Sequence, residues 1–248
     1  MKSTIGLIGL GTMGAALAKN LANHGFKISV WNRSYEKITE LANSANNDNI
    51  YAPKDFEDFI ESLEKPRKII LMVTAGEPMQ KVLHSLYPAL QYGDIVIDGG
   101  NSYFRDTEMY QKELAPRGIK FLGMGISGGE KGALWGPSMM IGGEDLAAKQ
   151  VEPILKSIAA LDFDRNACAE YVGEGGSGHF VKMVHNGIEY AEMQIIAEAY
   201  DLLRQVYKLK NEEIADIFEK FNEGESSSFL LESAVKVLLK KEDGLDLI

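Results

Sequence analysis

Three glycines near the N-terminus constrain the fold of this chain more than any other feature. Gly9, Gly11 and Gly14 form the pattern G-x-G-x-x-G between a strand pattern at Thr4–Ile8 and a helical pattern at Met13–Asn23. In such a turn the first glycine permits a tight bend, the second lets the backbone approach a pyrophosphate, and the third allows close helix–strand packing. The N–H groups at the helix N-terminus then bind the phosphates. A glycine turn that binds nothing is the alternative, but the flanking strand and helix favour a dinucleotide.

The residues after the second strand pattern, Lys27–Trp31, indicate which dinucleotide binds. NAD-binding domains usually carry Asp or Glu there, and the carboxylate accepts a hydrogen bond from the ribose 2′-hydroxyl. This chain has Asn32, Arg33 and Ser34 instead, with Lys37 one helical turn later. A guanidinium and a hydroxyl bind a 2′-phosphate that a carboxylate would repel, so the sequence predicts NADP rather than NAD. In the alternative, Ser34 caps a helix and Arg33 is solvated, and both roles can hold together.

The first two thirds of the chain alternate short β-type runs with helical stretches, which is typical of a mostly parallel sheet. Further strands are expected at Lys68–Val73, Ile95–Asp98, Lys120–Gly123, Ser138–Ile141 and Ala169–Val172. Further helices are expected at Tyr35–Ala42, Pro78–Leu90, Thr107–Ala115 and Ala147–Ala160. The sequence therefore predicts the α/β class, with a Rossmann-type doubly wound sheet followed by the start of an all-helical domain.

The character of the sequence changes after Gly173. A hinge-like loop with glycines at positions 175, 176 and 178 follows, and no strand pattern appears after it. Helical patterns occupy His179–Lys208, Glu212–Phe221 and Phe229–Lys240. We therefore expect an NADP-binding Rossmann domain at 1–175 and a helical domain at 176–248. Little sequence remains to cover the apolar positions of the last helix, so this domain is expected to be truncated, or covered by a partner chain.

Charge, cysteine content and hydropathy limit the partners. A net charge of −10 argues against nucleic acid, whose binding needs a basic surface. Cys168 is the only cysteine, so no internal disulfide forms, which fits a reducing cytoplasm. No apolar run approaches the roughly 20 residues that span a bilayer, and the four histidines lack metal-ligand spacing. We expect a cytoplasmic protein without metal, nucleic acid or membrane among its partners.

Two later glycine-rich segments are candidates for ligand contact. Residues 98–101, Asp-Gly-Gly-Asn, follow a strand pattern, at the edge where open α/β sheets bind ligands. Residues 125–133 are expected to form a further loop that presents the Ser127 hydroxyl and backbone N–H groups. Each segment alone is more often a structural turn, but their shared position after strands favours a ligand.

Five polar residues share one face of the long helical pattern. They are Lys182, His185, Asn186, Glu189 and Tyr190, spaced by three and four. A solvated Lys–Glu stripe is the ordinary explanation. The helix begins directly after the glycine hinge, however, where an interdomain cleft would face the nicotinamide.

The chemistry of these residue types suits hydride transfer from an alcohol carbon. Hydride transfer from an alcohol carbon needs a base for the hydroxyl proton, and Lys182 can serve if burial or neighbouring charges lower its pKa. Glu189, about two turns along, could act as an acid toward a different substrate atom. His185 and Asn186 would orient hydroxyls or a carboxylate.

These motifs together resemble the β-hydroxyacid dehydrogenase superfamily. The run Gly-His-Phe-Val-Lys-Met-Val-His-Asn-Gly-Ile-Glu-Tyr at 178–190 is more specific, and it strongly resembles the 6-phosphogluconate dehydrogenase family, as does Ser-Gly-Gly-Glu-Lys-Gly-Ala at 127–133. The similarity covers essentially the whole chain. It implies NADP-dependent oxidative decarboxylation of 6-phosphogluconate to ribulose 5-phosphate, CO2 and NADPH, a step of the pentose phosphate pathway and of gluconate utilization, without a metal.

The resemblance also implies roles for individual residues. Lys182 would take the proton of the 3-hydroxyl as hydride leaves C3, and Glu189 would help to protonate the enediol at C1. The implied substrate-binding residues are Asn101, Ser127, Gly128, Gly129, His185, Asn186 and Tyr190. The implied cofactor-binding residues are Gly9, Leu10, Gly11, Thr12, Met13, Gly14, Asn32, Arg33, Ser34, Lys37, Val73, Thr74, Ala75 and Asn101.

Members of that family continue into a large helical dimerisation domain, which supplies further basic residues for the substrate phosphate. No region of this chain matches those residues, so turnover is expected to be impaired while cofactor binding survives. The oligomeric state stays open, and a homo-oligomer is one of the alternatives. Two other functions also stay open: a simpler β-hydroxyacid dehydrogenase, such as one acting on 3-hydroxyisobutyrate, and a non-catalytic NADP-binding module.

Overall fold

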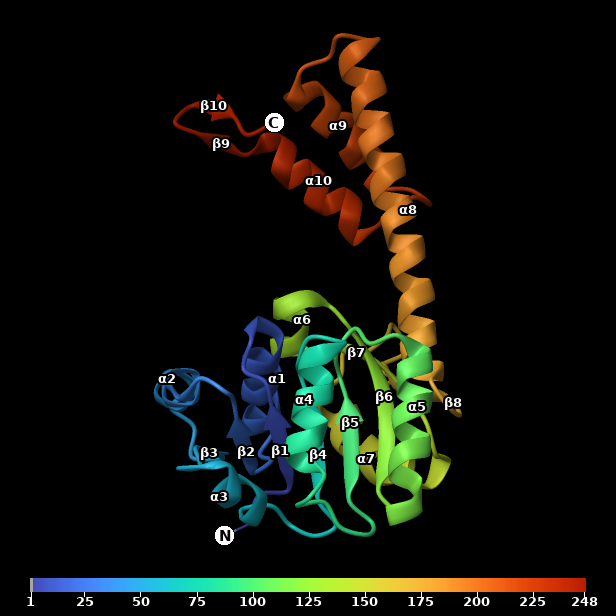
Figure 1. Cartoon of the computed structure of the whole chain (residues 1–248). Coiled ribbons are helices and arrows are strands. Elements are labelled where there is room, and N and C mark those ends of the chain that lie inside the picture. The colour runs from blue at the N-terminus through green and yellow to red at the C-terminus, as the bar shows by residue number, and fades with distance from the viewer. Residues whose placement is uncertain (1) are drawn as a thin grey trace. The chain divides into compact units, whose positions relative to one another are not determined.

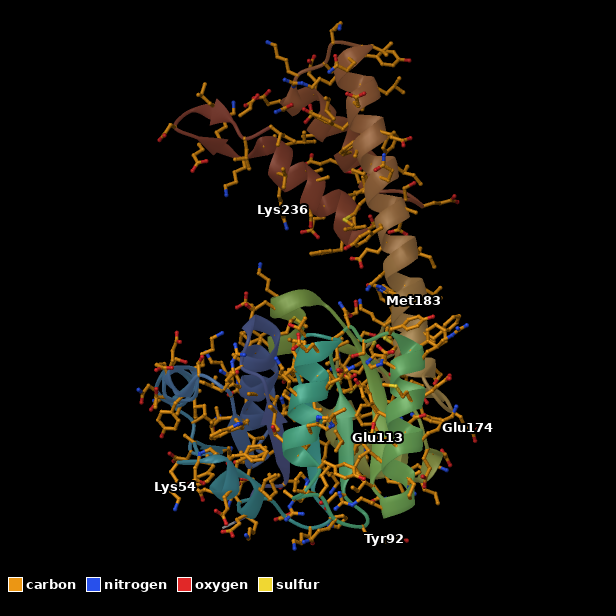
Figure 2. All side chains as sticks on the ribbon, viewed as in Figure 1. Lys54, Tyr92, Glu113, Glu174, Met183 and Lys236 are labelled. Carbon is orange, nitrogen blue, oxygen red and sulfur yellow. The ribbon has the colours of Figure 1, made fainter. Side chains whose placement is uncertain are left out.

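The computed structural model describes residues 2–248, which form two compact units. The first extends to Met183 and the second is Val184–Ile248. The boundary between them falls inside one long helix, α8 (Ser177–Gln205), on which Figure 2 labels Met183. The first turns of α8, including Lys182, therefore belong to the first unit.

An eight-stranded sheet forms the centre of the first unit (Figure 1), with strand order β3-β2-β1-β4-β5-β6-β7-β8. The strands are β1 (Ile5–Ile8), β2 (Ile28–Trp31), β3 (Ile50–Tyr51), β4 (Lys68–Leu71), β5 (Ile95–Asp98), β6 (Lys120–Ser127), β7 (Ser138–Gly142) and β8 (Ala169–Gly173). Neighbouring strands are parallel except for the antiparallel pair of β6 and β7. The strand order reverses between β1 and β4, which makes a topological switch point. The predicted Rossmann-type doubly wound sheet is confirmed.

Helices cover both faces of the sheet. They are α1 (Thr12–Asn23), α2 (Tyr35–Ala45), α3 (Phe56–Glu61), α4 (Glu77–Leu86), α5 (Phe104–Leu114), α6 (Gly129–Trp135) and α7 (Asp145–Ile158), with a short 3-10 turn at Ala115–Arg117. Side chains alternate between two buried clusters. On β5, Ile95 and Ile97 pack with α1, α2 and α7, whereas Val96 packs with α3, α4 and α5. Figure 1 accordingly shows α4 and α5 on one side of the sheet and α7 on the other.

A buried ion pair joins the starts of β4 and β5. The Arg67 guanidinium donates to the Asp94 carboxylate at 2.8 Å, and the Arg67 backbone N–H donates to the other carboxylate oxygen at 2.7 Å. The Gln91 backbone N–H donates to the same carboxylate at 2.9 Å. Both charged residues are buried, so each charge depends on the other for compensation. The pair lies at the amino edge of the strands, away from the edge where ligands of such sheets bind.

The second unit contains the rest of α8, α9 (Asn211–Asn222), α10 (Phe229–Leu239) and a short hairpin. Its core joins residues of α9 and α10, including Phe218, Leu231 and Leu238, to apolar side chains of α8. Across residues 2–248, no helix is both long enough and apolar enough for a bilayer crossing.

The hairpin contradicts the expectation that no strand follows Gly173. Strands β9 (Lys241–Glu242) and β10 (Leu245–Asp246) pair in antiparallel fashion. Asp243 and Gly244 connect them with positive φ angles of 52° and 81°. Asp-Gly at two such positions is the usual two-residue turn of a hairpin. The hairpin could therefore have been predicted from its turn residues, but not from any strand periodicity.

Other expectations about local structure were also wrong. The segment 125–133 is not one loop, because β6 continues to Ser127 and α6 begins at Gly129. Helix α4 ends at Leu86 and not at Leu90, because Pro88 has no N–H with which to continue the helix. The sequence prediction also missed β3 and α3. Two residues of strand leave no readable periodicity, although the Asp55 carboxylate caps α3 by accepting from the Asp58 N–H.

Candidate functional site

Loops after three neighbouring parallel strands come together at the switch point. A Cβ atom placed on Gly9, after β1, would lie 2.3 Å from the carbonyl oxygen of Met72, which follows β4. A Cβ on Gly100, after β5, would lie 2.7 Å from the carbonyl oxygen of Val73. The absence of these Cβ atoms allows the close packing. The structure thus brings together the glycine turn, the predicted segment Val73–Ala75 and the loop that carries Asn101.

The geometry of the β1–α1 turn fits a dinucleotide pyrophosphate. Gly9 has a φ of 101°, and a Cβ on Gly14 would lie only 1.9 Å from the Gly9 carbonyl oxygen, so both positions require glycine. Around Gly11, by contrast, no described atom beyond its chain neighbours lies within 4 Å of an added Cβ. The first turn of α1 has neither a capping side chain nor an acidic residue. Its N–H groups can therefore bind an anion beside the open Gly11.

Asn32 connects this turn to the loop after β2. Its side-chain oxygen accepts from the Leu10 N–H at 2.9 Å, and its amide nitrogen donates to the Ser34 carbonyl oxygen at 3.1 Å. The amide therefore fixes the backbone on both sides.

The residues predicted to bind a 2′-phosphate follow Asn32. Ser34 is the N-cap residue of α2, as the alternative expected, although its side chain makes no capping hydrogen bond. Arg33 and Lys37 are exposed, and within residues 2–248 neither forms an ion pair. Glu36 lies in the same first turn of α2 and is the one acidic residue of that turn.

Lys182 is buried in the first unit, with an exposed fraction of 8%. Its stem packs on β6, where a Cβ on Gly125 would lie 2.5 Å from the Lys182 Cβ. Because alternate strand residues share a face, Gly125 and Ser127 lie on the same side of β6. Ser127 is half-buried and Gly128 and Gly129 are exposed, at the end of the strand against which Lys182 packs.

A buried polar group beside Lys182 was not predicted as a site. The ring of His179 contacts the Thr107 hydroxyl of α5 through Nδ1 at 2.7 Å, and the Asp98 carbonyl oxygen through Nε2 at 3.1 Å. Burial raises the pKa of the Asp98 carboxyl and lowers the pKa of His179. Sequence position was the signal that could have identified this group. His179 lies three residues before Lys182, and Asp98 directly precedes Gly99 and Gly100.

The remaining predicted residues of the polar helix face lie in the second unit. On α8, His185 Nδ1 lies 3.6 Å from the Glu189 carboxylate and 3.4 Å from the Asn186 side-chain oxygen. Tyr190 is exposed. These contacts join His185, Asn186 and Glu189 into one polar group, whereas Lys182 is the member of the face that belongs to the first unit. Among residues 2–248, no cluster of histidine, cysteine and carboxylate side chains has the composition of a metal site.

Comparison with known proteins gives matches along nearly the whole chain. Residues 4–173 match the NAD binding domain of 6-phosphogluconate dehydrogenase, and residues 178–248 match the C-terminal domain of the same enzyme. Two relatives from Bacillus subtilis (strain 168) are decarboxylating 6-phosphogluconate dehydrogenases. The NAD(+)-dependent one is 49% identical over 243 residues, and the NADP(+)-dependent one is 48% identical over 242 residues.

A solved structure of 6-phosphogluconate dehydrogenase from Plasmodium falciparum is also similar, with a TM-score of 0.92 and 40% identity. That enzyme was determined in its apo form, with its cofactor NADP+ and with its substrate 6-phosphogluconate. Each of the three comparisons covers 98% of this chain, but only 52%, 51% and 52% of the respective relative. The chain therefore spans about half the length of the relatives it matches. On the evidence of the family match and of the shared fold, this chain belongs to the 6-phosphogluconate dehydrogenase family.

Proposed function

We propose that this chain carries the cofactor domain and the catalytic lysine of an NADP-dependent, decarboxylating 6-phosphogluconate dehydrogenase. The observation that carries the proposal is the burial of Lys182 against β6, in the unit that also holds the glycine turn and the loops after β4 and β5. A buried lysine with an open dinucleotide turn in the same unit suits hydride transfer from a hydroxyl-bearing carbon. The proposal places the reaction in the cytoplasm and leaves room for a homo-oligomer.

The oxidation step uses Lys182 as a base. Its neutral amine accepts the proton of the substrate 3-hydroxyl while the C3 hydrogen leaves as hydride, which gives a 3-keto acid. Bound NADP would supply the hydride acceptor. The ammonium of Lys182 can then stabilise charge on the C3 oxygen as the bond between C1 and C2 breaks and CO2 leaves. Glu189 is assigned the protonation of the resulting enediol carbon, which becomes C1 of ribulose 5-phosphate.

The same proposal assigns residues to the binding of the substrate and of the cofactor. The substrate hydroxyls and carboxylate are assigned to Asn101, Ser127, Gly128, Gly129, His185, Asn186 and Tyr190. The cofactor is assigned to the turn 9–14, to Val73, Thr74, Ala75 and Asn101, and to Asn32, Arg33, Ser34 and Lys37. The choice of NADP rests on the exposed side chains of Arg33 and Lys37 and on the Ser34 hydroxyl, which makes no capping hydrogen bond to α2. Overall identity does not decide it, because NAD- and NADP-dependent relatives match about equally well.

Turnover by the purified chain tests this function. We expect formation of NADPH and CO2 from NADP and 6-phosphogluconate at an impaired rate, unchanged by a metal chelator, with little or no reaction on gluconate or 3-hydroxyisobutyrate. Reduction of the cofactor by 3-hydroxyisobutyrate would instead indicate a simpler β-hydroxyacid dehydrogenase. Saturable NADP binding without NADPH formation at high substrate concentration would indicate a binding module.

Replacing Arg33 with alanine is expected to weaken NADP binding by about 10- to 100-fold, the loss of one or two charge-assisted hydrogen bonds. NAD has no 2′-phosphate, so its affinity should change little. Titration calorimetry with both dinucleotides measures the two affinities. Arg165→Ala, at an exposed arginine in the loop before β8, is the matched control, and an equal loss for NAD and NADP would refute the assignment of Arg33.

Replacing Asn32 with alanine should give a different pattern. The variant loses the bond from the Leu10 N–H and the bond to the Ser34 carbonyl oxygen, so the turn beneath the pyrophosphate loosens. We therefore expect NAD and NADP to lose affinity together, by about 5- to 30-fold for one or two hydrogen bonds. The same calorimetric titrations measure this effect. A loss confined to NADP would show that Asn32 acts on the 2′-phosphate directly.

A further inference from the structure

We propose that His179 is a positioning residue that fixes Lys182 relative to the loop carrying Asn101. The inference rests on the proposed function, in which Lys182 and Asn101 serve the same substrate. It concerns the first unit alone, because α8 up to Met183, β5, β6 and α5 all belong to that unit.

Two glycines of β6 bring the start of α8 onto the sheet. A Cβ on Gly123 would lie 2.9 Å from Nδ1 of His179, and a Cβ on Gly125 would lie 2.5 Å from the Lys182 Cβ. Residues two apart on a strand share a face, and so do residues three apart on a helix. His179 and Lys182 are therefore adjacent contacts of one helix face with one strand face. A shift of the His179 side chain moves the helix segment from which Lys182 projects.

Gly178 removes the remaining space between helix and sheet. A Cβ on Gly178 would lie 2.2 Å from the Gly123 carbonyl oxygen and 2.5 Å from the Met140 carbonyl oxygen. The backbone of α8 thus touches the backbones of β6 and β7. At such close range, a displacement of α8 by a few tenths of an ångström would bring its backbone into the backbones of the strands. The helix therefore has very few allowed positions, and the hydrogen bonds of His179 favour one of them.

His179 connects α8 to two other elements. Its Nε2 lies 3.1 Å from the Asp98 carbonyl oxygen, and its Nδ1 lies 2.7 Å from the Thr107 hydroxyl. Asp98 is the last residue of β5 and directly precedes Gly99, Gly100 and Asn101. The imidazole thus links the end of β5, directly before the Asn101 loop, to the helix of Lys182.

The two partners determine which nitrogen of His179 carries the proton. A carbonyl oxygen only accepts, so Nε2 must carry the hydrogen and donate to Asp98. The Thr107 hydroxyl can then donate to the unprotonated Nδ1. Burial lowers the pKa of His179, although the neighbouring Asp98 charge opposes that shift, and a neutral ring suits a site where both nitrogens are already engaged. His179 therefore holds position and does not exchange protons with the substrate.

Matched variants separate the hydrogen bonds from the volume of the side chains. His179→Gln offers an amide nitrogen to donate to the Asp98 carbonyl and an oxygen to accept from Thr107, whereas His179→Leu offers neither. Thr107→Ser keeps the hydroxyl donor and Thr107→Val removes it at nearly constant shape. Thr107→Val also covers the case in which His179→Leu fails to fold.

Turnover and binding give the first readout. We expect His179→Leu and Thr107→Val to lower kcat by about 10- to 100-fold, the usual effect of misplacing a reacting group by about 1 Å. The dissociation constant for NADP should stay within about threefold, since most residues assigned to the cofactor lie in the glycine turn, after β2 and after β4, which the variants leave untouched. His179→Gln and Thr107→Ser should restore most of kcat. Full activity of both apolar variants, or an equal loss in all four, overturns the proposal.

A second readout needs no turnover. Reductive methylation of the full chain with formaldehyde and a borohydride, followed by peptide mass spectrometry, compares Lys182 with the exposed Lys149 in the same molecule. We expect Lys182 to react about tenfold faster in His179→Leu and Thr107→Val than in the wild type, and at the wild-type rate in the two conservative variants. Unchanged protection of Lys182 in both apolar variants contradicts the positioning role. If the wild type forms no NADPH, the proposed function fails while this measurement still decides the role of His179.

Discussion

Lys182→Met is expected to lower NADPH formation by about 10²- to 10⁴-fold, the range of a single general acid–base group. Methionine fills nearly the same volume on Gly125 of β6 but has no amine to accept the proton of the substrate hydroxyl. The affinity for NADP should remain near the wild-type value, because the contacts of the glycine turn come from other elements. Steady-state rates with 6-phosphogluconate, together with calorimetric titration of NADP, separate the two effects.

The matched control for this experiment is Lys149→Met. Lys149 is an exposed lysine of α7 that pairs with Asp145 on the same helix, and its loss should leave the rate unchanged. A Lys182→Met protein that retains more than about a tenth of the wild-type rate would rule out Lys182 as the base. A protein that loses NADP binding as well would show that the substitution damages the fold of the first unit.

Asp94→Ala is expected to destabilise the first unit by about 3–5 kcal/mol, because it leaves the buried Arg67 guanidinium without its counter-charge. The variant also removes the acceptor for the backbone N–H groups of Arg67 and Gln91. Such a loss is a large fraction of the stability of an ordinary domain, about 5–15 kcal/mol. Urea unfolding followed by circular dichroism and tryptophan fluorescence measures it.

Two further variants show whether the charge pair itself is responsible. Asp145→Ala breaks an exposed ion pair on α7 and should leave the urea midpoint near the wild-type value. Replacing Arg67 and Asp94 together with apolar residues should cost less than Asp94→Ala alone, because no uncompensated charge stays buried. If the double variant is the less stable protein, the hydrogen bonds to the backbone matter more than the charges.

The parts of the fold that were predictable from sequence are those with strong local signals. The glycine turn is recognisable from the spacing of its glycines. The strands β1, β4 and β5 are recognisable as short apolar runs next to helical patterns, and together these signals predict the doubly wound sheet. Positions such as Asn32 and Arg33 could be singled out as candidates because they occupy fixed places relative to these strands. The expected end of β6 at Gly123 was wrong for a physical reason. Glycines usually interrupt strands, but Gly123 and Gly125 are needed where α8 packs on the sheet.

The parts that could not be predicted depend on contacts between distant segments. His179, Thr107 and Asp98 are separated by up to 81 residues along the chain, and no local pattern connects a histidine to a threonine and a strand-end carbonyl. Burial of Lys182 was similarly invisible, because a lysine at helical spacing is usually solvated. The sequence could suggest that Lys182 performs chemistry, but only the packing of α8 on Gly125 shows that its side chain is buried.

The glycines of β6 set a limit on how far this protein can be engineered for robustness. Valine or isoleucine at position 125 would raise the intrinsic preference of that segment for a strand. Strand propensity alone would therefore favour the change. A Cβ atom there would nevertheless lie 2.5 Å from the Lys182 Cβ and 2.8 Å from the Gly178 carbonyl oxygen, and either the helix or the amine would have to move. The substitution would therefore strain the packing of α8 on β6 as well as displace Lys182, and a thermostabilisation campaign should leave position 125 unchanged and look for gains on the outer strands.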